Sequence, residues 1–201
     1  MGNTTHSSVM SRNVKGGPHV RLWLWVLVTA VPVVALLRSA AQETAPSEYQ
    51  VKAACIYNFT KFIGWPPEAF PPERSSPFVI GVIGDDPFNG ELQRAVQNKD
   101  VGGRGFVVRH LRNAGEAKAC HILFVCRSER KSMADILAAV ATLPVLTVSE
   151  SDRFVQLGGI INFLVEQNKV RFEINAEAAK KAGLKISSNL LNLGRRYERN
   201  P

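Results

Sequence analysis

Apolar side chains recur at helical spacing in the stretch from about Ser47 to Ile63. Ser47 and Gln50 form the S-x-x-Q pattern of a capping box, and the apolar positions behind it lie three or four residues apart: Val51, Cys55, Phe59 and Phe62. Trp65-Pro66-Pro67 follows, and proline lacks an amide hydrogen and disfavours helix in the residue before it. The pattern predicts a first helix that ends before Trp65.

In the middle of the chain, apolar runs alternate with helical stripes. Residues 78–83 are a nearly continuous apolar run, which is typical of a strand covered on both faces. Asp86 and Pro87 then suit the N-cap and the first position of a helix, whose apolar stripe would be Phe88, Leu92, Ala95 and Val96. The same alternation predicts strands over residues 106–111, 121–126 and 145–148, and a helix over 131–141.

Strict alternation of apolar and polar residues marks the last part of the chain. Apolar side chains occupy every second position on both sides of Gln167-Asn168: Ile161, Phe163 and Val165 before it, and Val170, Phe172 and Ile174 after it. This pattern predicts a β-hairpin with one buried face. Two helices are expected after it, over residues 176–182 and from about residue 188.

Strands that alternate with helices predict an α/β fold. Short connections and right-handed crossovers give a three-layer, mainly parallel sheet flanked by helices, and the C-terminal antiparallel hairpin should extend that sheet. The part of the chain from residue 42 to residue 201 is of a size that fits one hydrophobic core. We therefore expect a single domain over residues 42–201.

The first 41 residues have a different composition. They hold four cationic side chains and no acidic ones, and residues 22–37 are apolar apart from Thr29 and Pro32. Ser39, Ala40 and Ala41 then supply the small residues that a signal peptidase requires, so residues 1–41 are predicted to be a signal peptide that is cleaved before Gln42. The alternative is an uncleaved inner-membrane anchor that leaves the domain facing the periplasm, although the apolar stretch is shorter than the roughly 20 residues that span a bilayer.

Without this leader the chain is only mildly basic. Four of the 25 basic residues lie in the leader, which leaves 21 against 17 acidic residues and lowers the net charge from +8 to +4. No helix is rich in Arg and Lys, so nucleic-acid binding is not expected.

The three cysteines allow at most one internal disulfide. Cys120 and Cys126 are about 20 Å apart if they share one strand, which is too far for a bridge, so a disulfide would join Cys55 to one of them. Buried free thiols are the alternative.

Few residues suggest chemistry. Asp85 and Asp86 follow the first predicted strand, where two carboxylates could hold a metal or a ligand, but a helix cap beside a solvated acid is the simpler interpretation. His110 and His121 fall on two strands predicted to be neighbours, without the ligand spacing of a zinc site. No G-x-S-x-G motif is present. We therefore predict a protein that is not an enzyme and has no cofactor or metal.

Two surfaces are candidates for binding. The polar side of the hairpin carries Asn162, Arg171, Glu173 and Asn175, which are expected to point out of the core and either to contact a partner or to form a solvated sheet face. The edge of that hairpin would also be open to strand addition. The second candidate is a small-molecule crevice formed by Asp85, Asp86 and residues 149–152.

Segments in the same order along the predicted domain give the sequence a wider resemblance. It is similar to the YfiR family of periplasmic regulators in Val51-Lys52-Ala53-Ala54, Tyr57-Asn58-Phe59, Lys61-Phe62, Trp65-Pro66, Gly84-Asp85-Asp86-Pro87-Phe88, Cys120-His121-Ile122-Leu123-Phe124, Val145-Leu146-Thr147-Val148-Ser149, Phe154, Gly158-Gly159-Ile160-Ile161-Asn162-Phe163, Val170-Arg171-Phe172-Glu173-Ile174-Asn175 and Ala182-Gly183-Leu184-Lys185-Ile186-Ser187-Ser188.

The resemblance implies an exported α/β domain that forms a homodimer. It further implies a repressor that contacts the periplasmic part of an inner-membrane diguanylate cyclase and keeps cyclic-di-GMP synthesis low, with a link to biofilm formation. Family members can carry disulfides, but the cysteines of this chain, one of them in the first helix, do not clearly supply a family bridge. The alternative function is that of a periplasmic small-molecule-binding protein.

Overall fold

The computed structural model describes residues 46–71 and 76–198. Within these ranges no helix is both long and apolar enough to cross a membrane. The predicted signal peptide over residues 1–41 lies outside the described residues, and so does the proposed cleavage site before Gln42.

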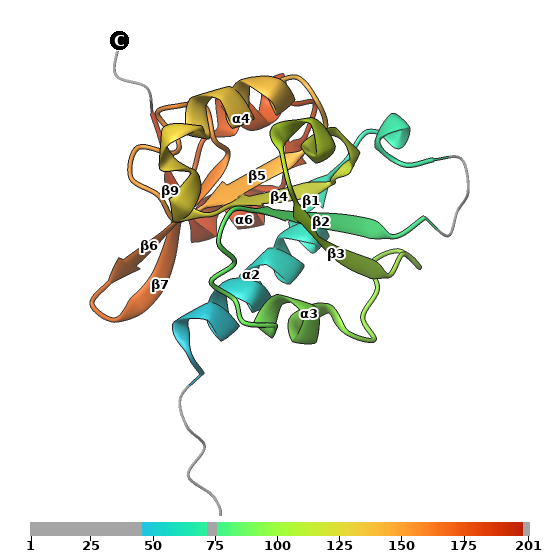
Figure 1. Cartoon of the computed structure of the whole chain (residues 1–201), viewed down its shortest axis with the longest axis horizontal. Coiled ribbons are helices and arrows are strands. Elements are labelled where there is room, and N and C mark those ends of the chain that lie inside the picture. The colour runs from blue at the N-terminus through green and yellow to red at the C-terminus, as the bar shows by residue number, and fades with distance from the viewer. Residues whose placement is uncertain (1–45, 72–75, 199–201) are drawn as a thin grey trace, which may run out of the picture. The chain divides into compact units, whose positions relative to one another are not determined.

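In the described part of the chain, seven strands form the main sheet, and most of them are parallel (Figure 1). The first five strands in spatial order run parallel: β3 (Phe106–Leu111), β2 (Phe78–Ile83), β4 (Ile122–Val125), β5 (Leu146–Ser149) and β6 (Ile161–Glu166). β7 (Lys169–Ile174) pairs antiparallel with β6, and the short β9 (Arg195–Arg196) adds to β7. A separate two-stranded ribbon joins β1 (Ile63–Gly64) to β8 (Lys185–Ile186).

Helices cover both faces of this sheet, as the alternation of strands and helices predicts. One face packs against α2 (Glu48–Phe62), α3 (Glu91–Val96), α5 (Ala176–Lys181) and α6 (Ser188–Leu193). The other packs against α4 (Met133–Val140) and the 3-10 helix η3 (Ala114–Ala119). Figure 1 shows α4 on the opposite side of the sheet from α2 and α3. The three-layer α/β fold is confirmed.

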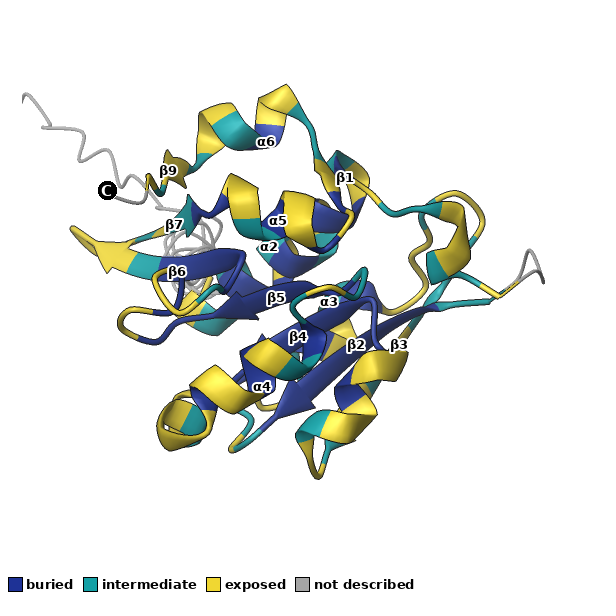
Figure 2. Ribbon diagram, turned by 90° about the horizontal axis from the view of Figure 1, so that it is seen from above, coloured by how far each residue is buried: buried dark blue, intermediate teal, exposed yellow. Residues whose placement is uncertain are grey.

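The central strands are buried on both faces, which explains their continuous apolar sequence. Ile80 and Phe124 point into the core on the α2 side, whereas Ile83 and Leu123 point into the core on the α4 side. All four are at most 4% exposed. Figure 2 shows these strands in the buried colour between helices whose outer faces are exposed.

The first helix starts as expected, but its buried stripe is shifted. Ser47 Oγ accepts a hydrogen bond from the Gln50 amide at 3.3 Å, and Gln50 Oε1 accepts one from the Ser47 amide at 2.8 Å, so the capping box is confirmed. The most buried positions of α2 are Lys52, Ala53, Ile56, Phe59 and Thr60. Of the predicted stripe only Phe59 belongs to this set, while Val51, Cys55 and Phe62 are half-buried.

The predicted start of the second helix is wrong. α3 begins at Glu91 with Gly90 as its N-cap, whereas Asp86 Oδ1 accepts a hydrogen bond from the amide of Phe88 at 2.8 Å. That bond spans two residues and belongs to a short turn, which competes with helix formation at this point. The helix therefore starts four residues later than the N-cap pattern indicated.

The hairpin forms in the predicted register. Pairs run from Ile161↔Ile174 to Glu166↔Lys169, and the two turn residues both have positive φ, 50° at Gln167 and 59° at Asn168. This geometry matches the right-handed twist of the strands. On the apolar side, the ring of Phe59 lies 5.9 Å from that of Phe163 and 5.2 Å from that of Phe172, so the hairpin base packs on α2.

A buried histidine fastens the segment after β1 to the sheet. His121 Nδ1 accepts a hydrogen bond from the amide of Val79 at 3.0 Å, which leaves Nε2 to donate to the carbonyl of Ala69 at 3.0 Å. The ring also stacks on Phe70 with 4.4 Å between centroids. Only the neutral ring with its proton on Nε2 satisfies both bonds, because a proton on Nδ1 would face the Val79 N–H.

We expect this histidine to make stability depend on pH. Burial lowers the pKa of His121 below its ordinary value of 6.5; the charge of Arg104 also lowers it, and the bond to Ala69 opposes both. As pH falls below 6.5, the unfolded chain takes up a proton that the folded chain resists, so the free energy of unfolding decreases. In urea unfolding between pH 7.5 and 5, the stability advantage of wild type over His121→Leu should shrink as pH falls. An advantage that stays constant would contradict the prediction, and His110→Gln serves as the exposed-histidine control.

Candidate functional site

The carboxyl ends of the parallel strands meet at one edge of the sheet, where open α/β sheets place ligands. The strand order reverses between β2 and β4, because β2 leads outward to β3 whereas β4 leads to β5. Asp85 follows β2, and its amide donates to Ser128 Oγ, just beyond β4, at 2.8 Å. The chain segments after β2 and β4 are thus joined at this point.

Asp86 is engaged with its neighbours. Its Oδ2 lies 2.7 Å from Nε2 of His110 on β3, while its Oδ1 holds the Phe88 amide. Asp85 is exposed. The expectation that His110 and His121 occupy neighbouring strands is wrong, since β2 lies between β3 and β4. No group of three or more His, Cys, Asp or Glu side chains within residues 46–71 and 76–198 is arranged to hold a metal ion.

A buried ion pair lies at the middle of this edge, at the end of β5. The Lys52 side chain from α2 is 1% exposed and pairs with Glu150, just after β5, whose side chain is 3% exposed. Lys52 also pairs with Glu48, one turn earlier in α2, which is largely open to solvent. A buried ammonium is tolerated only when it is paired and hydrogen-bonded, and these two carboxylates meet that requirement.

Two further side chains contact the carboxylate of Glu150. The Tyr49 hydroxyl donates to Glu150 Oε1 at 3.0 Å, and Arg127 Nε lies 3.4 Å from the same oxygen. Burial raises the pKa of Tyr49 to about 12, and the negative charge of Glu150 adds to the shift. Tyr49 therefore stays protonated and acts as a hydrogen-bond donor that fixes the start of α2 on the sheet.

The crevice expected for a small molecule is filled by these contacts. Ser149, Glu150 and Ser151 are at most 6% exposed. Ser149 Oγ donates to the carbonyl of Val125 at 2.7 Å and lies 3.2 Å from Ser151 Oγ. Asp152 is exposed and pairs with Arg130 at 3.4 Å. Polar groups converge at this edge as expected, but they bind one another.

The polar residues of the hairpin lie on one sheet face, as predicted, but they differ in exposure. Asn162 pairs with Glu173 in the ladder and donates to its Oε1 at 3.3 Å. Asn162 and Asn175 are 2% and 6% exposed, so the expectation that they point into solvent is wrong. Asn175 caps α5 through the amide of Ala178 at 2.9 Å and donates to the carbonyl of Val155 at 2.9 Å.

The outer half of the hairpin is open to solvent. We call residues 164–171 the hairpin arm, and Figure 1 shows it extending away from the body of the domain. Arg171 is exposed, Val165 is 49% exposed, and Glu166 pairs with Arg195 of β9. β9 covers β7 only beside Glu173 and Ile174, so no described strand pairs with the outer side of β7 over the arm. Of the predicted binding residues, Arg171 has the most accessible position on this hairpin.

Sequence reasoning missed Lys52 as a buried group, although a signal was present. Lys52, Ile56, Phe59 and Ile63 follow one another at spacings of four, three and four residues, which places Lys52 on the buried side of the helix. Glu48 lies four residues earlier and supplies an intrahelical partner. The pairing with Glu150 spans 98 residues and could not be derived from local pattern.

The cysteines are all free thiols: Cys120 and Cys126 are buried and Cys55 is half-buried. Burial raises the pKa of Cys126 to about 12 and that of Cys120 to about 11, and burial also raises that of Cys55. Their thiolates are therefore scarce at neutral pH, which makes them poor nucleophiles.

Comparison with known proteins gives a family and a fold. A family model described as YfiR/HmsC-like matches residues 49–195. No curated protein sequence matches the chain. A crystal structure of a conserved domain protein from Vibrio cholerae has a TM-score of 0.51 at 11% identity; the alignment covers 77% of this chain and 62% of that one. The ABC domain in complex with L-Trp from Streptococcus pneumoniae has a TM-score of 0.43 at 10% identity and covers 59% of this chain and 54% of that one.

We expect removal of one member of the buried ion pair to be costly. Glu150→Ala leaves the Lys52 ammonium buried without its main partner, which should lower the free energy of unfolding by about 3–5 kcal/mol. The double variant Lys52→Met/Glu150→Leu replaces both charges by apolar groups and should recover most of that loss. Urea unfolding of the two variants at pH 7 measures the difference. Equal stability of the single and double variants would contradict this account of the pair.

Proposed function

The chain belongs to the YfiR/HmsC-like family, and from this premise we propose that it represses an inner-membrane diguanylate cyclase by binding the periplasmic part of that enzyme. Members of the family are periplasmic regulators of cyclic-di-GMP signalling, and they are regulatory rather than catalytic. The family model spans nearly all of the described domain. A role through contact with another protein therefore has more support than one through chemistry.

The hairpin arm is the observation that supports a contact surface. Arg171 and Val165 are open to solvent on opposite faces of this two-stranded element, and the backbone of β7 is unpaired there among the described strands. Interfaces combine exposed apolar groups with arginine, and a free strand edge adds main-chain hydrogen bonds. We propose that the partner contact lies on the arm and extends to Glu173, two residues beyond its inner end.

Export is part of this proposal. The leader over residues 1–41 has the composition of a signal peptide, and cleavage before Gln42 would release the domain into the periplasm. In the same proposal the protein acts as a homodimer, which would present two arms to a dimeric membrane protein. Asp85 and Asp86 lie at the carboxyl edge of the sheet and form a second, smaller part of the proposed surface.

Repression requires differential binding to two states of the cyclase. A ligand shifts a conformational equilibrium only by as much as its affinities for the two states differ. To change the inactive-to-active ratio from 1:99 to 99:1, the protein would need an approximately 10⁴-fold preference for the inactive state. Binding and repression are therefore separate quantities, and both need to be measured.

The proposal predicts that loss of the protein raises cyclic-di-GMP and that the arm is required for repression. Arg171→Glu should weaken binding to the detergent-solubilised cyclase of the same organism by at least tenfold, or about 1.4 kcal/mol, because it reverses the charge of an exposed contact residue. Lys118→Glu makes the same charge change on η3 and is the matched control. Binding isotherms and cellular cyclic-di-GMP levels provide the two measurements. Wild-type binding and repression by Arg171→Glu would exclude the arm, and unchanged cyclic-di-GMP after gene deletion would exclude the function.

A further inference from the structure

The first strand of the sheet has a free side. β3 pairs with β2 on one side, and no other described strand pairs with it on the other. The Phe78 amide donates to the carbonyl of Gly105 at 2.8 Å, which sets the hydrogen-bond pattern of this parallel pair. In a parallel strand, the backbone N–H and C=O groups of successive residues point alternately to the two neighbouring sides. Those of Gly105 point to β2, so those of Val108 and His110, three and five residues later, point away from β2. An added strand would find unused donors and acceptors there.

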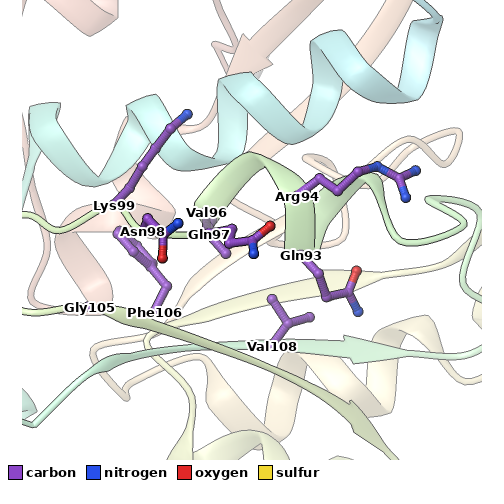
Figure 3. Close-up of a pocket in the computed structure, with 9 residues that line it drawn as sticks. All are labelled: Gln93, Arg94, Val96, Gln97, Asn98, Lys99, Gly105, Phe106 and Val108. Carbon is purple, nitrogen blue, oxygen red and sulfur yellow. The ribbon is translucent and has the colours of Figure 1, made fainter.

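A groove runs beside this free side. A cavity of about 630 Å³ lies between β3 and α3, with Phe106 and Val108 of the strand and Gln93, Gln97 and Asn98 in or just after the helix among its lining residues (Figure 3). Val107, which points to the other sheet face, is 37% exposed. The strand therefore offers apolar side chains to solvent on both faces, an arrangement that proteins usually avoid on a free edge.

Two cations line the groove: Arg94, which pairs with Glu91, and Lys99, which with nearby Lys61 and Arg109 has no ion pair among the described residues. Lys61 and Lys99 place their ammonium groups 4.4 Å and 4.5 Å from the centre of the same ring, that of Tyr57, and the ring of Tyr57 lies 5.6 Å from that of Phe106. Figure 3 shows Lys99 reaching from the groove toward α2. Arg109 is exposed on the opposite face of β3. Among the described residues, none of these three cations forms an ion pair with a carboxylate.

We propose that β3 and the α3 groove form a second interaction site, which accepts an extended segment of a partner protein as an eighth strand. The partner segment alternates apolar residues, which enter the groove over Phe106 and Val108, with acidic residues, which face Arg109. A further acidic residue at one end lies against Lys61 and Lys99. Main-chain hydrogen bonds to the free edge supply affinity, and the groove supplies specificity for alternate side chains. This site lies at the opposite end of the sheet from the hairpin arm.

The charge pattern favours this occupant over a second copy of the chain. In an antiparallel pair of two β3 strands centred on Val108, Arg109 of each copy would lie opposite Val107 of the other, and the two arginines would be diagonal neighbours on one face. Like charges at such a short separation would destabilise the pairing of the two strands. An acidic strand instead supplies a counter-charge for each cation.

A synthetic peptide tests the site without reference to the cyclase. The probe is acetyl-Glu-Val-Glu-Val-Glu-Val-Glu-amide, added to the full mature domain while amide hydrogen exchange is followed by NMR. The amides of Val108 and His110 should exchange at least tenfold more slowly with the peptide. The lysine-for-glutamate peptide should give no protection, and Lys99→Glu should weaken binding at least fivefold. Lys118→Glu, which lies on η3, should leave binding unchanged.

A backbone variant separates edge pairing from simple charge attraction. Val108→Pro removes an amide that points away from β2, so the pairing of β2 with β3 keeps its own donors while the added strand loses one. This variant should lose at least tenfold in peptide affinity. Circular dichroism and thermal unfolding check that it folds; should it not fold, the exchange data and Lys99→Glu still decide the question.

Three results would overturn the proposal. One is the absence of protection at Val108 and His110 with the acidic peptide. Another is equal protection by the lysine peptide. The third is dimerisation of the peptide-free domain that Val108→Pro abolishes, which would assign the edge to a second copy. The proposed repression of the cyclase is tested separately, by cellular cyclic-di-GMP levels. Its failure would not change the peptide result.

Discussion

The central strands of this domain lie between two layers of helices, and that burial governs where polar groups can be placed. β2, β4 and β5 are apolar on both faces, so a charged or hydrogen-bonding side chain on them has no access to water. Those that do occur, Thr147 and Ser149, bond to backbone groups: Thr147 Oγ1 accepts from the Ile160 amide, and Ser149 Oγ donates to the Val125 carbonyl. Polar side chains that could contact another molecule are consequently confined to the ends and edges of the sheet.

At the carboxyl edge the same constraint produces a closed polar network. Lys52 and Glu150 are buried together, Tyr49 donates a hydrogen bond to the carboxylate, and Arg127 forms an ion pair with it. A pair of this kind contributes little net stability compared with apolar residues, but it is specific, because each charge requires its partner. It fixes the start of α2 against the end of β5. The part of the edge beside β5, a place where open α/β sheets bind ligands, is thus filled by the protein's own side chains.

The sequence was sufficient for the architecture because its signals are local. Continuous apolar runs predicted the buried strands, the capping box predicted the start of α2, and strict alternation around Gln167-Asn168 predicted the hairpin and its register. The start of α3 failed for a local reason, the turn that Asp86 forms with the Phe88 amide, whereas the other failures concern contacts between distant segments. His110 and His121 looked like neighbours in sequence order, but β2 lies between their strands. Asn175 looked like a surface residue because the hairpin alternates, yet the loop containing Val155 covers it.

The two ends of the sheet, β3 at one and β7 with its short neighbour β9 at the other, differ in how they avoid unwanted pairing. β7 is partly covered by β9, and the ion pair of Glu166 with Arg195 ties the arm to that cover. Charged side chains and short covering strands are the usual protection of sheet edges. β3 has six residues, no described covering strand and three consecutive apolar side chains, Phe106, Val107 and Val108. Among the described residues its one ion pair with an acid, His110 with Asp86, is near its end. An edge so little protected, beside a groove and unpaired cations, is better suited to binding a strand than to remaining free.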